Sequence, residues 1–367
     1  MKKLDWYILK KFLTTFFFAI FLFTVVAIVI DVSEKADDFV KSHLSLKAII
    51  TQYYFGFVPH IIALLFPLFV FIAVIFFTSK MAGRTEVIAI LASGTSFNRW
   101  LRPYYVGGIF LATLLWFANH YVVPNANKIR GAFEAKYFDP NSSYENLIKS
   151  RFGSGSDFYV KTDSFTYTGV YNYDTTSKSG GPVFMNTIKN NKVVENTRAE
   201  IIRWDTAKKK WQLQNIIIRK LNAMGEETKE IAEQRYNLNF TPSEIKKDKY
   251  TKDKLSSPEL AKFIKLEELR GSEGLSELKV EQGRRDATPV TVALLTIIGA
   301  VIAGRKVRGG SGVHLALGFI IAAVFILADK FSTIFSTKGN LPPAVAVWIP
   351  NFVFVFVVIY LYRKAPK

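Results

Sequence analysis

The chain alternates between long apolar stretches without charge and shorter charged ones. Six uncharged intervals stand out: 12–30, 48–79, 103–127, 287–304, 309–328 and 339–362. Each can supply the roughly 17–25 residues that a helix needs to cross a hydrocarbon core about 30 Å thick. Half of all residues are hydrophobic and the mean hydropathy is +0.17. The pattern predicts an α-helical polytopic membrane protein with six transmembrane helices in a 3+3 arrangement.

The segment between the third and fourth intervals has a different pattern. From Lys128 to Arg285 it is rich in charge and holds short stretches of aromatic and β-branched residues: DFYVKT, SFTYTGVYNY, GPVFMNTI and EIIRW. Trp204 and Trp211 flank the polar turn DTAKKK, which is typical of a hairpin. We therefore predict an inserted all-β domain over residues 128–255, built as an antiparallel sandwich, a jelly roll or an open barrel.

A short helix is predicted after this domain, in SSPELAKFIKLEELRG. Ser257 suits the N-cap, Pro258 the first helical position and Gly271 the end. Residues 256–286 then form a connecting helix and linker. The first three spans occupy residues 1–127 and the last three occupy residues 287–367.

The charge balance is strongly basic, with 48 Lys and Arg against 30 Asp and Glu and a net charge of +18. The basic residues gather at the edges of the spans, which argues against a soluble nucleic-acid binder. Four groups fall on one side of a six-span bundle, and the positive-inside rule makes that side, with both termini, cytoplasmic. The groups are Lys2, Lys3, Lys10 and Lys11; Lys80, Arg84, Arg99 and Arg102; Arg305, Lys306 and Arg308; and Arg363, Lys364 and Lys367.

The first apolar interval is expected to remain as a span rather than to be cleaved. It is long for the core of a signal peptide, and FTVVAIVIDVSE lacks a small-residue cleavage motif. The chain has no Cys, which excludes disulfides and thiolate metal sites. Its four His residues are scattered, so isolated polar positions are favoured over a metal site.

Motifs for catalysis are missing from the sequence. The dipeptide Gly-Lys is absent, so the chain cannot build a P-loop, and neither HExxH nor G-x-S-x-G occurs. We expect no enzyme active site and no cofactor in this chain. The adjacent Asp329 and Lys330 at the outer end of the fifth interval favour an interfacial pair over a proton relay.

The segment KMAGRTEVIAILASGTSFNRW, between the second and third intervals, is too apolar for a plain loop and too short to span. Its apolar residues follow helical spacing, so we predict a short helix within about 84–98 that ends near Gly94. Such a helix, with Glu86 at its start, suits a groove on a cytoplasmic partner. An interfacial helix without a partner explains the pattern equally well.

Several cations are expected near the outer mouth of the bundle. Lys35 and Lys41 follow the first span, and Lys128 and Arg130 follow the third. Cations in this position suit the phosphate groups of an outer-leaflet lipid. Solvated loop charge is the simpler interpretation from the residues alone.

The order of elements and six stretches of sequence resemble the LptF/LptG type of lipopolysaccharide export permease, also called the YjgP/YjgQ family. The resemblance covers essentially the whole chain. The stretches are LDWYILKKF, GRTEVIAILASG, VVPNAN, EQGRRDATPV, RKVRGG and LPPAVAVWIPN. The start LDWYILKKF leans slightly towards the LptG type.

The resemblance implies the permease subunit of an ABC exporter in the bacterial inner membrane. It implies a second permease of the same family, a separate cytoplasmic ATPase dimer that uses ATP and Mg, and a periplasmic β-jellyroll that passes lipopolysaccharide to a jellyroll bridge. The helix becomes a coupling helix that contacts the ATPase, and the outer cations would meet lipid A phosphates. The coupling residues are Arg84, Glu86, Val87, Ile90, Leu91 and Gly94; the phosphate candidates are Lys35, Lys41, Lys128 and Arg130.

A second hypothesis is a membrane-anchored envelope scaffold whose outer β domain binds other envelope proteins. Six spans are more than an anchor needs, and the short cytoplasmic helix would then have no purpose. An ion-coupled transporter would need a cluster of ionisable residues inside the spans, which the sequence lacks.

Overall fold

The computed structural model describes residues 2–137, 156–174, 177–222, 225–242, 251–271, 274–305 and 310–365. The chain divides into a helical unit and a β unit. The helical unit comprises residues 1–137, 252–260 and 276–367, and the β unit comprises residues 138–251 and 261–275. Of the basic residues predicted at the span edges, Lys306, Arg308 and Lys367 lie outside the described residues.

The helical unit contains the six predicted spans. Six stretches of helix are long and apolar enough to cross a membrane: Lys3–Glu34, Leu46–Gly83, Phe97–Glu134, Leu275–Ala303, Gly312–Thr337 and Pro343–Arg363. Each contains or overlaps one of the uncharged intervals, so the expectation of six membrane helices is confirmed. Several helices extend into polar sequence beyond the intervals. The third continues past residue 127, and the fourth begins before residue 287.

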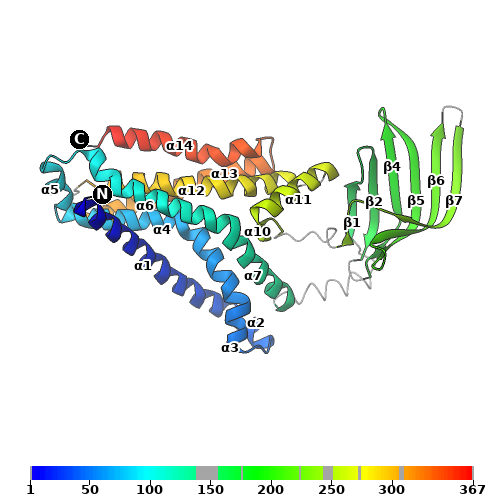
Figure 1. Ribbon diagram of the computed structural model, residues 1–367, viewed down its shortest axis with the longest axis horizontal. Helices are drawn as coiled ribbons and strands as arrows, with labels where there is room; N and C mark the ends of the chain where they lie inside the picture. The colour runs from blue at the N-terminus through cyan, green and yellow to red at the C-terminus, as the bar shows by residue number, and fades with distance from the viewer. Residues whose placement is uncertain are drawn as a thin grey trace. The chain divides into compact units, whose positions relative to one another are not determined.

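The elements of the helical unit follow the chain order drawn in Figure 1. Two one-turn π-helical segments, η1 and η2, interrupt the second and third spans. The helices of the first half are α1 (Lys3–Glu34), α2 (Ala36–Lys41), α3 (Leu46–Ile49), η1 (Ile50–Tyr54), α4 (Phe55–Gly83), α5 (Glu86–Ala92), α6 (Phe97–Phe117), η2 (Ala118–Val122) and α7 (Val123–Tyr137). Those of the second half are α10 (Thr251–Lys254), α11 (Ser257–Arg270), α12 (Leu275–Ala303), α13 (Gly310–Thr337) and α14 (Pro343–Arg363).

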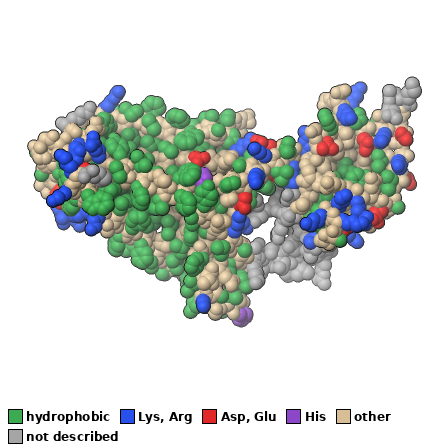
Figure 2. All heavy atoms as spheres, in the orientation of Figure 1, with side chains coloured by type: hydrophobic (Ala, Val, Ile, Leu, Met, Phe, Trp, Pro, Cys, Tyr) green, Lys and Arg blue, Asp and Glu red, His purple; other side chains and the backbone are tan. Residues whose placement is uncertain are grey.

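The core of the helical unit is aromatic and lies mainly between α1, α4, α6 and α12. Phe12, Phe16, Trp100 and Tyr104 are each at most 1% exposed. The apolar side chains that point away from this core form the broad hydrophobic surface seen in Figure 2. Exposed apolar area of this extent matches a hydrocarbon environment rather than water.

Helix α11 begins one residue earlier than the sequence suggested. The amide of Leu260 donates to the carbonyl of Ser256 at 2.7 Å, and the carboxylate of Glu259 accepts from the amide of Ser256 at 2.8 Å. Ser256 is therefore the N-cap, not Ser257, because Glu259 completes half of a capping box with it. Gly271, with φ of +65°, follows the last helical residue as predicted.

The β unit is one antiparallel sheet of seven strands, inserted between the third and fourth spans. Along the sheet the order is β1-β2-β4-β5-β6-β7, and β3 pairs with β5. The strands are β1 (Ser156–Lys161), β2 (Thr166–Tyr173), β3 (Ser179–Gly180), β4 (Val183–Lys189), β5 (Lys192–Asp205), β6 (Lys210–Asn222) and β7 (Gly225–Tyr236). The predicted all-β insertion is confirmed.

The predicted hairpin forms the centre of this sheet. Trp204 and Trp211 are directly paired across β5 and β6, with ring centroids 5.0 Å apart. Trp211 is fully buried, and its indole N–H donates to the carbonyl of Phe240 at 2.7 Å. The chain after β7 therefore returns to cover the core face of the sheet. A buried indole needs such an acceptor, which fixes where this segment docks.

Candidate functional site

Helix α5 lies at the end of the helical unit where both termini lie (Figure 1). It contains seven residues, fewer than the predicted range of 84–98. Thr85 precedes it in the left-handed region with φ of +59°, and Gly94 follows with φ of +84°. These two reversals separate α5 from the helices before and after it. Left-handed backbone is costly for a β-branched residue such as Thr, so the turn at Thr85 stores strain.

One face of α5 is occupied by the chain's own core. Val87 is 1% exposed, and Ile90 and Leu91 pack partly buried against the same cluster. The apolar spacing that predicted the helix therefore holds it onto the bundle and leaves Val87 no surface for a partner. The opposite face is open, with Ile88 at 48% exposure. Arg84, the C-cap of α4, is also exposed.

Glu86 connects α5 to the first span. The hydroxyl of Tyr7 donates to Oε2 of Glu86 at 3.4 Å. Because Glu86 is the first residue of α5, its carboxylate also lies at the positive end of that helix. The sequence singled out Glu86 but not its contact with Tyr7, because the contact joins residues far apart in the chain.

A second polar cluster lies near the end of α1 opposite its N-terminus. Asp31 is 6% exposed and accepts three hydrogen bonds. Its Oδ1 accepts from Lys35 Nζ at 2.7 Å and from the Tyr53 hydroxyl at 3.0 Å, and its Oδ2 accepts from the Tyr54 hydroxyl at 3.1 Å. Both tyrosines come from η1, where the π-helical turn brings successive rings towards α1.

Glu134 of α7 joins two of the predicted phosphate ligands. Its Oε1 lies 3.8 Å from Lys35 Nζ and 3.6 Å from Arg130 Nε. Close packing of α4 against α7 makes this approach feasible. A Cβ on Gly56 would lie 2.5 Å from the carbonyl oxygen of Ala126, so only glycine fits there. The structure thus brings Lys35 and Arg130 together through one shared carboxylate.

The other two predicted cations lie apart from this pair. Lys128 Nζ binds Glu259 of α11 at 2.8 Å. This hydrogen bond, with one from the Ser256 amide, lowers the pKa of Glu259 to about 2. Lys41 lies exposed in the last turn of α2 and forms no ion pair within the described part of the chain.

The run EQGRRD in α12 forms polar contacts that sequence reasoning missed. Arg284 binds Asp329 of α13 at 3.1 Å. Arg285, 4% exposed, donates to the carbonyl of Lys252 at 2.9 Å. Asp286 accepts from the indole of Trp116 at 3.0 Å. The sequence suggested that Asp329 forms an interfacial pair with the adjacent Lys330, but the structure pairs Asp329 with Arg284 of α12. Consecutive charges at the start of an apolar helix were the available signal, but their partners depend on tertiary packing.

Basic side chains gather at the end of the helical unit that carries α5, as Figure 2 shows. No group of three or more His, Asp or Glu that could hold a metal is found among the described residues. Within the described residues, the bundle therefore presents a short surface helix at one end, Lys35 and Arg130 bound to carboxylates at the other, and an apolar surface between them.

Comparison with known proteins gives a single assignment. A search of curated proteins finds no match. The family model described as lipopolysaccharide export system permease LptF/LptG matches residues 6–364. That range includes α5, the Asp31 cluster, the β unit and the α12 contacts. The chain therefore belongs to the LptF/LptG family of lipopolysaccharide export system permeases.

Proposed function

We propose that this chain is the membrane subunit of an ATP-driven exporter that extracts lipopolysaccharide from the bacterial inner membrane and passes it to a periplasmic jellyroll bridge. In this proposal a cytoplasmic ATPase dimer binds ATP and Mg, and a second permease of the same family completes the cavity. Both termini are cytoplasmic and the β unit is periplasmic. The observation that carries the proposal is α5: its inner face is fixed on the bundle while Arg84 and Ile88 are left open to a partner.

Helix α1 supports a mechanical link between the ATPase and the lipid. Its first turns contact Glu86 through Tyr7, and its last turn carries Asp31. A helix of 32 residues extends about 48 Å. A push on α5 would therefore move the cation cluster at the other end through one rigid element. Val87 takes part by fixing α5, and Glu86 takes part as the polar contact.

The cation cluster supports phosphate binding by partner exchange. Lys35 and Arg130 are neutralised by Asp31 and Glu134. A lipid phosphate offers a doubly charged acceptor in place of these carboxylates, so binding does not require an isolated buried cation beforehand. Lys128 and Lys41 would extend the contact towards the rim.

The energetics explain why hydrolysis is needed. Each CH₂ group of an acyl chain contributes about 0.8 kcal/mol to its membrane burial, so a lipid with several chains does not leave the bilayer unaided. Closure of the cavity would drive the lipid upward. The edge strands β1 and β7 leave unpaired backbone groups, within the described sheet, that suit pairing with a next jellyroll.

The proposal is tested by affinity purification of the tagged chain from its native membranes, with mass spectrometry of bound proteins and lipids. We expect a P-loop ATPase, a second six-span permease and lipopolysaccharide. Glu86→Lys and Ile88→Glu should each reduce the recovered ATPase. Lys10→Glu, at the same end but outside α5, is the matched control and should leave recovery unchanged.

The outcome against the proposal is equally definite. Unchanged ATPase recovery with both α5 variants would remove the coupling role. Recovery of envelope proteins alone, without ATPase or lipopolysaccharide, would favour the scaffold. If Lys35→Gln recovers the full amount of ATPase and is the only variant that loses lipopolysaccharide, the phosphate contact lies in the Asp31 cluster.

A further inference from the structure

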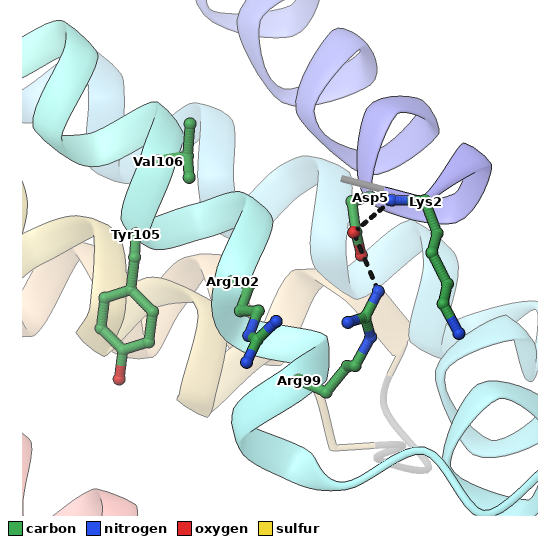
Figure 3. Close-up of a pocket in the computed structure, with 6 residues that line it drawn as sticks. All are labelled: Lys2, Asp5, Arg99, Arg102, Tyr105 and Val106. Carbon is green, nitrogen blue, oxygen red and sulfur yellow. Dashed lines mark hydrogen bonds and ion pairs between the residues drawn. The ribbon is translucent and has the colours of Figure 1, made fainter.

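A pocket of about 330 Å³ lies between the start of α1 and the start of α6. Figure 3 shows its lining: Lys2, Asp5, Arg99, Arg102, Tyr105 and Val106. Arg99, Arg102 and Val106 recur at helical spacing, so one face of α6 supplies most of the wall. The pocket lies far along α1 from the Asp31 cluster and shares no residue with α5.

The charge in this pocket is unbalanced. Asp5 is 5% exposed, and its Oδ2 accepts from the Lys2 amide at 2.7 Å and from Arg99 Nη2 at 3.1 Å. That carboxylate is therefore engaged in holding the two helices together. The Lys2 ammonium and the Arg102 guanidinium form no ion pair within the described residues. Three cations against one carboxylate leave a formal surplus of two positive charges.

The geometry suits one chemical group. A guanidinium presents a fork of N–H donors that matches the oxygens of a phosphate. Arg102 is exposed, and its guanidinium extends from α6 towards that of Arg99 (Figure 3). Lys2 supplies a second, flexible donor. Tyr105 and Val106 continue the wall further along α6 with an aromatic ring and an apolar side chain. Cationic residues followed by apolar ones reproduce the order of a lipid's headgroup and chains.

The surroundings indicate that the phosphate belongs to a lipid. Trp6, next to Asp5, is 62% exposed, as expected for a ring at the headgroup level. Both helices become apolar directly beyond the pocket and form candidate spans. We propose that this pocket binds the phosphate of an anionic phospholipid in the leaflet at the α5 end of the bundle. The bound lipid neutralises the surplus charge and ties α1 to α6 at the base of the transport unit.

The test uses native mass spectrometry of the purified full-length chain in detergent, with phosphatidylglycerol as probe and phosphatidylcholine as the zwitterionic reference. The wild type should retain phosphatidylglycerol selectively. The double variant Lys2→Gln with Arg102→Gln should bind it about tenfold more weakly, because two charge-assisted bonds are lost. The matched control, Lys10→Gln with Arg363→Gln, removes two exposed cations of the same end and should retain it.

Further arms keep the proposal open to refutation. Arg102→Lys preserves the charge and should weaken retention less than the double variant, which guards against misfolding of the latter. Equal loss in pocket and control variants would mean diffuse surface attraction and overturn the site. No loss in either would overturn it too. If excess inorganic phosphate displaces the lipid completely and binds by itself, the site belongs to free phosphate and the lipid assignment is wrong.

Discussion

The two ends of the helical unit differ in whether most of their basic side chains are paired with carboxylates. At the end that carries α5, Arg99 binds Asp5, but five other basic residues are exposed and form no ion pair within the described part of the chain: Lys10, Lys80, Arg84, Arg102 and Arg363. At the other end every predicted phosphate ligand except Lys41 is already bound to a carboxylate. The pairs are Lys35 with Asp31 and Glu134, Arg130 with Glu134, and Lys128 with Glu259.

The difference follows from burial. The side chain of Arg130 is 16% exposed and that of Asp31 is 8% exposed. Charges removed from water to this degree need partners, and pairing also fixes their positions. Cations that remain in water cost little to leave unpaired, and they keep their long-range attraction for anionic surfaces. Pairing near Asp31 fixes the positions of the cations, whereas the unpaired cations near α5 can attract anionic surfaces.

The largest effect is expected when the Asp31 carboxylate, at the centre of the paired end, is removed. Asp31→Ala takes the acceptor from the Tyr53 and Tyr54 hydroxyls and removes the closest carboxylate from Lys35, whose other contacts include the Tyr53 hydroxyl and, at 3.8 Å, Glu134. We expect the free energy of unfolding to fall by about 3 kcal/mol, because buried donors lose their partners. The measurement is denaturant unfolding of the purified protein in detergent, followed by tryptophan fluorescence.

Asp31→Asn is the control for this prediction. It keeps an acceptor oxygen and the shape of the side chain but not the charge, so a loss of about half the size is expected. If Asp31→Ala changes stability by no more than a surface substitution, the cluster does not hold α1 to η1. The comparison between the two ends would then fail at its buried end.

Much of the helical unit was predictable because one physical variable dominates it. Absence of charge over a span length marks a membrane helix, and all six were located in this way. The helix ends were less accessible. Both the third and the fourth spans extend into charged sequence. In the fourth, the residues EQGRRD find ion-pair and hydrogen-bond partners on neighbouring elements. Such partners depend on packing rather than on sequence periodicity.

The β unit shows where pattern reasoning stops. β1, β2 and β4 to β6 carry aromatic, apolar and β-branched residues and were anticipated. β7, GEETKEIAEQRY, was not, because it pairs only with β6 at the edge and most of its side chains are exposed. In this strand Ile231 and Tyr236 pack partly buried against the sheet core. An edge strand rich in Glu and Lys shows little alternation of apolar and polar residues, so its sequence does not predict a strand.

The sequence predicted the cations of the candidate site but not the carboxylates that bind them. The cations Lys35 and Arg130 were identified from their place after the spans, but Asp31 and Glu134 were not. The signal existed in the sequence, since Asp31 precedes Lys35 and Arg130 precedes Glu134 by one helical turn. What the sequence could not supply was the approach of Lys35, at the end of α1, to Glu134 of α7, because that contact depends on tertiary packing.

A smaller effect is expected at the rim of the paired end, where the contact between Lys128 and Glu259 is half exposed. The pKa of Glu259 is lowered to about 2, mainly by Lys128 and the Ser256 amide. A lowered pKa stabilises the folded state above the unfolded value of about 4.3 and loses that contribution as the pH falls towards 2. Glu259→Gln should therefore cost at most about 1 kcal/mol at pH 7, and almost nothing near pH 2.

Thermal unfolding of wild type and Glu259→Gln at pH 7 and at the lowest pH that keeps the protein soluble tests this. The difference between the two proteins should shrink as the pH falls. A difference that stays constant with pH would assign the loss to packing of the Glu259 stem or to the helix cap, and not to its charge. Glu277→Gln, which removes another exposed carboxylate that binds a lysine, Lys252, is the matched control for the loss of a surface charge.

The smallest change in stability is expected at the end that carries α5, here called the open end. This prediction separates an effect on the fold from an effect on a partner. Arg84→Gln removes an exposed cation that has no ion pair in the described chain, so the free energy of unfolding should change by less than about 0.5 kcal/mol. Under the proposed function, the same substitution should reduce the recovered ATPase, because an exposed charge beside α5 would then act on the partner and not on the fold. Lys10→Gln, also exposed at this end, should change neither quantity. A clear stability loss in Arg84→Gln would show that the open end is held by its charges as well, and the two ends would then differ in degree rather than in kind.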